Sequence, residues 1–117
     1  MAKLSTHVLD TVHGRPAGNV RIELFVLDDG RHRRIAEVRT NADGRTDRPL
    51  LEGEAVRRGR YRLVFHVGDY FRERGIALPD PAFVDVVPVD FGLAEEGGNY
   101  HVPLVCSPWT YSTYRGS

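Results

Sequence analysis

Two histidines stand out because each lies within a short apolar stretch. His7 belongs to residues 4–9 (LSTHVL), and His101 belongs to residues 100–104 (YHVPL). An imidazole titrates near neutral pH and can take a proton from water. A histidine in an apolar strand either finds a buried partner or faces a binding site. Both interpretations stay open here, and the second makes water activation the candidate chemistry.

Arg45 and the last nine residues are the other candidates. Arg45 follows the Asp43-Gly44 turn and therefore projects from a loop, where it is either solvated or holds a carbonyl or urate-like oxyanion through paired N–H donors. Residues 109–117 (WTYSTYRGS) are rich in aromatic side chains and carry Arg115. Such a tail either docks and contacts something planar or anionic, or frays from a last strand.

Other common site chemistries find little support. Zinc would need three or four ligands, but no two histidines have the spacing of a ligand pair, so we expect no metal site. Cys106 falls on the same strand face as Val102 and Leu104 and is expected to be a small buried hydrophobe. There is no glycine-rich phosphate loop. We expect no chemical role for the remaining histidines, which are His13, His32 and His66.

The elements that position these residues follow from an apolar period of two. It predicts strands over 4–9, 20–27, 34–40, 61–67, 83–91, 100–106 and 109–114. The strands at 20–27 and 34–40 should form a hairpin, and Pro88 predicts an edge strand or a bulge. A short helix should run from an N-cap at Asp69 to Gly75. The pattern predicts one all-β domain over residues 1–117, a sandwich of two sheets.

The amino-acid composition limits the classes of partner and the cellular location that we expect. The 16 basic and 16 acidic side chains cancel, so charge gives no reason to expect nucleic acid or an anionic membrane as a partner. The single cysteine excludes an internal disulfide and fits a reducing compartment. No signal core precedes the first strand and no apolar run approaches the length of a membrane span. We therefore expect a cytoplasmic protein.

Five sequence blocks occur in an order that is similar to a known family. They are residues 4–10 (LSTHVLD), 14–17 (GRPA), 40–45 (TNADGR), 100–104 (YHVPL) and 114–117 (YRGS). With them the chain resembles the 5-hydroxyisourate hydrolases of the transthyretin-like family over its whole length. The last four residues together with both histidines form a specific combination, because the transthyretins themselves lack them.

The resemblance implies a transthyretin-like sandwich of about eight strands and one short helix, assembled as a homotetramer with active sites in a channel between two dimers. It implies hydrolysis of 5-hydroxyisourate to 2-oxo-4-hydroxy-4-carboxy-5-ureidoimidazoline in urate breakdown, without a cofactor. The catalytic residues it implies are His7, Arg45 and His101. The substrate contacts it implies are His7, Arg45, Tyr114, Arg115, Gly116 and Ser117.

These residues suit a ring opening by water. We expect His7 and His101 to hold and deprotonate the water, and Arg45 to offset the charge that develops on the carbonyl oxygen. Two rivals remain: a transthyretin-like carrier of a small ligand without catalysis, and an accessory β-sandwich domain. Neither rival needs the histidine pair, whereas the hydrolase does.

Overall fold

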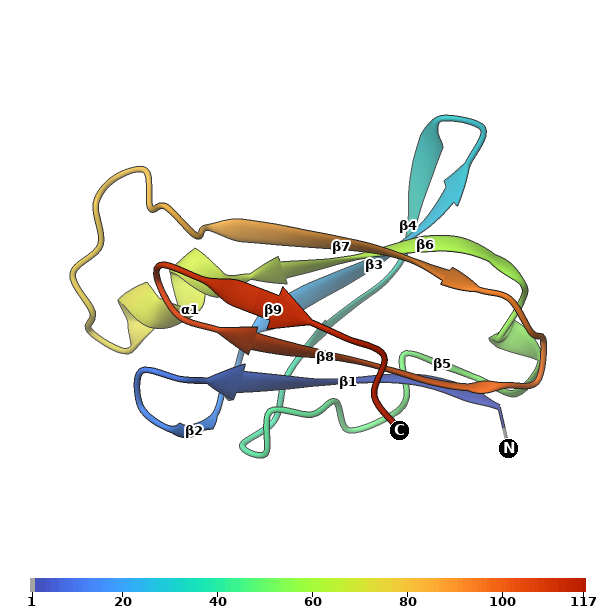
Figure 1. Ribbon diagram of the computed structural model, residues 1–117, viewed down its shortest axis with the longest axis horizontal. Helices are drawn as coiled ribbons and strands as arrows, with labels where there is room; N and C mark the ends of the chain where they lie inside the picture. The colour runs from blue at the N-terminus through green and yellow to red at the C-terminus, as the bar shows by residue number, and fades with distance from the viewer. Residues whose placement is uncertain (1) are drawn as a thin grey trace.

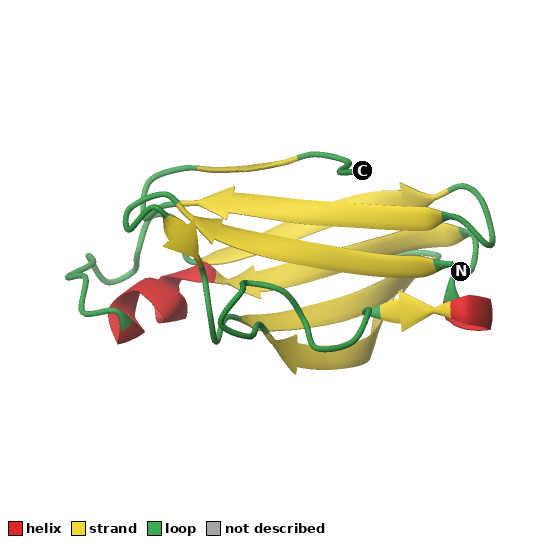
Figure 2. Ribbon diagram, turned by 90° about the horizontal axis from the view of Figure 1, so that it is seen from below, coloured by secondary structure: helices red, strands yellow, loops and turns green. Residues whose placement is uncertain are grey.

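The alternating sequence forms two stacked β-sheets with one helix at an end of the stack (Figures 1 and 2). The computed structural model describes residues 2–117. The first sheet has the order β2 (Arg15–Pro16), β1 (Lys3–Asp10), β8 (Asn99–Cys106) and β9 (Tyr111–Thr113), and β5 (Leu51–Glu52) also pairs with β1. The second sheet has the order β4 (Arg31–Arg39), β3 (Arg21–Asp28), β6 (Gly59–His66) and β7 (Val86–Leu93). The two-sheet β-sandwich predicted from the sequence is confirmed.

The core lies between the sheets and is built from every second residue of the long strands. Ile22 and Leu24 of β3 and Leu63 and Phe65 of β6 are fully buried, as is Leu4 of β1. Removing a side chain of this size from water contributes about 1.5–3 kcal/mol. The same alternation turns the intervening residues of each strand outward, which matters for β1 and β8 below.

Most of the predicted boundaries hold within two or three residues. The hairpin of β3 and β4 is confirmed, and Pro88 lies in β7, which is the edge of its sheet. The predicted helix start is wrong: α1 (Val67–Glu73) begins directly after β6, with His66 as its N-cap and no side-chain capping bond. Gly75 follows the C-cap with a positive φ of 82°, as expected of a terminating glycine.

Two short strands and a 3₁₀ turn were not predicted. β2, β5 and η1 (Gly53–Ala55) contain two or three residues each, which is too few for a period to be recognised. Within residues 2–117, no helix is long and apolar enough to cross a membrane.

The pairing of β1 with β8 positions the candidate site. The two strands run parallel, with Ser5 opposite His101 and His7 opposite Pro103. Leu4, Thr6 and Val8 of β1 point into the core and are buried, so the alternate residues of β1 lie on the outer face of the first sheet. His7 and His101 therefore share that outer face.

Candidate active site

His101 is the centre of the candidate site, and a side chain of the neighbouring strand holds it. Its Nδ1 lies 2.8 Å from Oγ of Ser5, which is directly opposite in the parallel register. The ring is half-buried against the strand. With Nδ1 engaged, Nε2 is the ring nitrogen that remains for another partner.

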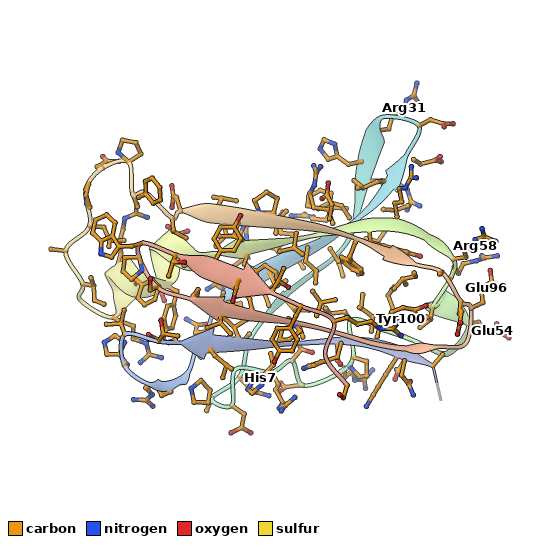
Figure 3. The ribbon with its side chains drawn as sticks, in the orientation of Figure 1. His7, Arg31, Glu54, Arg58, Glu96 and Tyr100 are labelled. Atoms are coloured by element: carbon orange, nitrogen blue, oxygen red, sulfur yellow. The ribbon has the colours of Figure 1, made fainter. Side chains whose placement is uncertain are left out.

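His7 is held through its other ring nitrogen, Nε2, rather than through Nδ1. Its Nε2 lies 2.8 Å from the backbone carbonyl oxygen of Asp43. A carbonyl oxygen only accepts hydrogen bonds, so Nε2 carries the hydrogen and donates it. The neutral ring then has its lone pair on Nδ1, which is free to accept a proton. Figure 3 shows His7 extending from β1 toward the loop that follows β4.

The loop of residues 41–45 supplies that carbonyl and also carries Arg45. The side-chain oxygen of Asn41 accepts hydrogen bonds from the backbone N–H of Asp43 at 2.9 Å and of Arg45 at 3.2 Å. The backbone N–H of Asn41 donates in turn to the carbonyl of Arg45 at 2.7 Å. These bonds close the turn on itself, so Arg45 projects from a fixed base although its side chain is exposed.

Gly44 attaches the loop to β1. Its carbonyl accepts a hydrogen bond from Val8 N–H at 2.8 Å, and its φ of +74° is in the region that favours glycine. A Cβ at this position would collide with the carbonyl oxygen of Val8. The close approach of the loop to β1 therefore requires glycine at position 44. This approach fixes the distance of Asp43 and Arg45 from β1.

The electrostatic surroundings keep His101 neutral. Burial lowers the pKa of His101 below its usual value of 6.5, and the positive charge of Arg45 lowers it further. His7 and Lys3 lower this pKa as well. An uncharged imidazole at neutral pH is the form that can accept a proton from water. A hollow of about 230 Å³ is lined by Arg45, by Ser5, which contacts the ring, and by Lys3, Thr6, Thr46 and Pro49.

The residues after β9 dock onto this face, so the fraying alternative for the tail is wrong. Gly116 N–H donates to the carbonyl of His101 at 2.8 Å. Gly116 also lies against the ring itself, because a Cβ there would sit 2.5 Å from Cδ2 of His101. The guanidinium carbon of Arg115 lies 4.6 Å from the ring centre of Tyr100. In Figure 1 the red terminal segment turns across β8.

The structure thus brings part of the predicted set together. His7, Arg45, His101 and Gly116 meet on one face, whereas Arg115 is directed at Tyr100. A neighbouring hollow of about 240 Å³ is lined by His101, Tyr114 and Arg115 together with β7. Tyr114 and Ser117 are both exposed.

Sequence reasoning missed two members of the site. Ser5 precedes His7 by two residues and therefore shares its strand face, so this spacing could have identified it. The carbonyl of Asp43 has no signal in the sequence, because any residue type would supply the same atom.

The other titratable groups named from the sequence lie outside this face. His13 is bound to the buried carboxylate of Asp10 at 2.5 Å, and His66 to Glu23 at 2.7 Å. Burial raises the pKa of the Cys106 thiol to about 12, which agrees with its prediction as a buried hydrophobe. Within residues 2–117, no three His, Cys, Asp or Glu side chains gather in a way that could hold a metal ion.

Comparisons with known proteins agree with this geometry. A family model described as HIUase/Transthyretin family matches residues 4–116. A protein of Ralstonia nicotianae named 5-hydroxyisourate hydrolase is 56% identical over 117 residues, which is 100% of both chains. The structure of Klebsiella pneumoniae 5-hydroxyisourate hydrolase superposes with a TM-score of 0.80 at 32% identity, covering 100% of this chain and 94% of that one.

A transthyretin has the same fold. The crystal structure of transthyretin from Sparus aurata gives a TM-score of 0.87 at 30% identity, covering 99% of this chain and 97% of that one. The fold alone is therefore shared by proteins of both names, and the residues of the outer face must distinguish them. The match of the family model over nearly the whole sequence, together with full-length relatives, shows that the chain belongs to the HIUase/transthyretin family.

Proposed function

We propose that this protein is a 5-hydroxyisourate hydrolase, which opens a ring of its substrate with water to give 2-oxo-4-hydroxy-4-carboxy-5-ureidoimidazoline. One observation carries the proposal. His7 and His101 share one face beside Arg45, and each has one ring nitrogen held by the protein and the other left free. Relatives of 44–56% identity over nearly the full length carry this enzyme's name.

The arrangement suits each step of the ring opening. A neutral histidine of the pair takes a proton from water while the water oxygen attacks the ring carbonyl carbon. The resulting oxyanion lies against Arg45, whose guanidinium offers paired donors and a fixed charge. As the carbonyl re-forms, the C–N bond breaks and the histidine returns the proton to the leaving nitrogen. Positioned acid–base help of this kind contributes about 10²–10⁴ in rate.

The docked tail closes one side of this site. In this proposal Tyr114, Gly116 and Ser117 contact the substrate and help to exclude bulk water. The stacking of Arg115 on Tyr100 favours an anchoring role for that guanidinium over a substrate contact. Figure 3 labels Tyr100, near the end of the sandwich where β8 begins.

The assembly belongs to the same proposal. We propose a homotetramer in which the outer faces of the first sheets line a channel between two dimers. β7 and β9 each end a sheet, and exposed apolar side chains lie on or beside them, namely Phe83, Val86, Trp109 and Tyr111. Unpaired edges with apolar neighbours favour association. The cytoplasmic location stays a prediction from the sequence.

The rival function is binding without catalysis, which the likeness to a transthyretin favours. Turnover of freshly generated 5-hydroxyisourate separates the two. The loss of its near-ultraviolet absorbance is followed against the slow spontaneous decay, for the wild type, His101→Asn and His32→Asn. His32 is an exposed histidine of the β3–β4 hairpin and serves as the matched control.

We expect fast decay with the wild type and with His32→Asn, and background decay with His101→Asn at unchanged thermal stability. A folded wild type that only matches the spontaneous rate would reject the hydrolase and leave ligand binding to be tested. A fully active His101→Asn would reject the two-histidine mechanism while keeping the enzyme.

A further inference from the structure

The partner of His101 is a hydroxyl that the ring-opening scheme above does not use. Ser5 and His101 are direct neighbours in the parallel pair, and the distance between Oγ and Nδ1 is 2.8 Å. Adjacent strands lie about 4.8 Å apart, so a short side chain spans the gap without a flexible reach. The eight paired positions of β1 and β8 fix this juxtaposition through the backbone.

A second contact limits the ring from another side. Gly116 lies against Cδ2 of His101, and its N–H is bonded to the carbonyl of the same residue. Rotation of the ring about its side-chain bonds would break the bond to Ser5 or drive the ring into Gly116. Gly116 thus covers Cδ2, and Ser5 bonds Nδ1. Of the two ring nitrogens, Nε2 is the one left for water or substrate.

The Ser5 hydroxyl can accept a hydrogen bond from Nδ1–H of His101. A neutral imidazole has one N–H, and the hydrogen bond made by one nitrogen decides the state of the other. When Nδ1–H donates to Oγ of Ser5, the lone pair is on Nε2. Burial lowers the pKa of His101 most, and Arg45, His7 and Lys3 lower it further, while a hydrogen bond with the Ser5 backbone raises it. The net lowering favours the neutral ring that this tautomer requires.

We propose that Ser5 is a positioning residue for the hydrolysis, whose hydroxyl holds Nδ1 of His101 and thereby presents an unprotonated Nε2 to the attacking water. This rests on the proposed function. His7 is held through Nε2 by Asp43, so it presents Nδ1 instead. The two histidines therefore offer different nitrogens to one substrate, each set by a partner of its own.

Kinetics of Ser5→Ala and Ser5→Thr test the role. Loss of the partner that orients a metal-bound histidine costs about 10–100-fold in metal affinity or activity, and we apply the same scale to His101. We expect kcat of Ser5→Ala to fall by about 10-fold or more with KM changed less than about two-fold, because Ser5 orients the ring without touching the substrate. Ser5→Thr keeps the hydroxyl and should recover most of kcat.

Thr11→Val is the matched control. Thr11 follows β1 directly, and its Oγ1 donates to the carbonyl of Cys106, the last residue of β8, at 3.1 Å. This variant therefore also removes a hydroxyl hydrogen bond to β8, but at the other end of the strand pair from His101. Its kcat should stay within about two-fold of the wild type. An equal loss in Thr11→Val and Ser5→Ala would mean that Ser5 merely supports the strand pair, and would overturn the proposal.

A spectroscopic readout does not depend on turnover. Ring ¹⁵N shifts of histidine-labelled protein, with the His101 signals assigned from His101→Asn, should show Nδ1 protonated at pH 7.5 or so in the wild type, above the usual titration of the ring. Ser5→Ala should shift this tautomer balance toward Nε2–H. A wild-type ring protonated on Nε2 would overturn the proposal.

The failures can be told apart. If the wild type does not hydrolyse 5-hydroxyisourate, the proposed function fails. If the wild type is active and Ser5→Ala matches it in kcat, only the role of Ser5 fails.

Discussion

His101 and His7 illustrate how the same side chain acquires different properties from its partners. The hydroxyl that holds His101 can donate or accept, whereas the Asp43 carbonyl that holds His7 only accepts. His7 is therefore confined to one neutral tautomer, and a charged His7 would keep the same bond. His101 depends in addition on the burial and the positive charges that favour its neutral form.

The lowered pKa of His101 predicts a pH profile. Burial and Arg45 lower this pKa below 6.5, and the unprotonated ring is the base. The value of kcat/KM should therefore rise with pH to a plateau, with a midpoint below 6.5. Initial rates between about pH 5 and about pH 8, corrected for spontaneous decay, measure it. A midpoint above 6.5 would contradict the assignment of His101 as the base.

The same shift affects stability in a defined direction. Because the folded pKa of His101 lies below the unfolded value, the unfolded chain binds more protons between the two. Above the unfolded pKa, His101 is neutral in both states and does not change the free energy of unfolding. As pH falls from the unfolded pKa toward the folded pKa, His101 lowers the free energy of unfolding.

At the residue scale the sequence identified the right side chains but not their contacts. Histidines in apolar strands could be recognised as unusual because an imidazole there needs a partner. That the partner of His101 would be Ser5 depends on a parallel pairing between residues 96 positions apart, which local pattern does not encode. The bond between His13 and Asp10 could not be predicted, because nothing in the sequence distinguishes Asp10 from an ordinary aspartate at the end of a strand.

Among the elements, the loop of residues 41–45 is the one whose geometry is most constrained. Gly44→Ala should destabilise the protein by more than the roughly 1–3 kcal/mol of a strained backbone position, because its Cβ also meets the carbonyl oxygen of Val8. Activity should fall as well, since the loop carries both Asp43 and Arg45. Denaturant unfolding and turnover of the variant measure the two effects.

Gly97→Ala is the control for Gly44→Ala. Gly97 has a similar φ of +80°, but a Cβ there meets nothing within 4 Å. Its loss of unfolding free energy should therefore report backbone strain alone. Equal losses in the two variants would show that the contact with Val8 does not limit the loop.

The tail is an element whose removal should affect activity more than stability. Residues 114–117 are exposed or half-buried, and Gly116 N–H makes one backbone hydrogen bond to β8. Deleting them should cut turnover while lowering the unfolding free energy by about 1 kcal/mol or less. Parallel thermal melts and assays check this. A large fall in melting temperature would recast the tail as structural.

The long elements could be predicted because their buried faces recur at every second residue, as in β3 and β6. The predicted N-cap, Asp69, lies three residues after the observed N-cap, His66, because Asp69 is a favourable capping type, yet α1 begins at Val67 as a direct continuation of β6. The buried face of α1, which includes Val67, Tyr70 and Phe71, decided its start over the capping preference.

At the scale of the whole molecule, the proposed homotetramer can be tested through an exposed sheet edge. Light scattering should give the mass of four chains of 13.2 kDa each. Val86→Lys places a charge on β7 where the side chain is 51% exposed, and it should reduce this mass and the activity together. Val12→Lys, at 49% exposure on the β1–β2 turn, should leave both unchanged. A wild type that is monomeric and fully active would contradict the tetramer.

The parallel pair of β1 and β8 has a consequence for synthesis. Ser5 and His101 are 96 positions apart, and a ribosome adding about 5–20 residues per second needs roughly 5–20 s between them. During that interval β1 has no β8 to pair with, and its edge is open to other chains. The nascent protein is thus inert until β8 has emerged. A chain that ends before β8 lacks His101 and leaves the edge of β1 unpaired, so we expect it to be inactive and prone to aggregate.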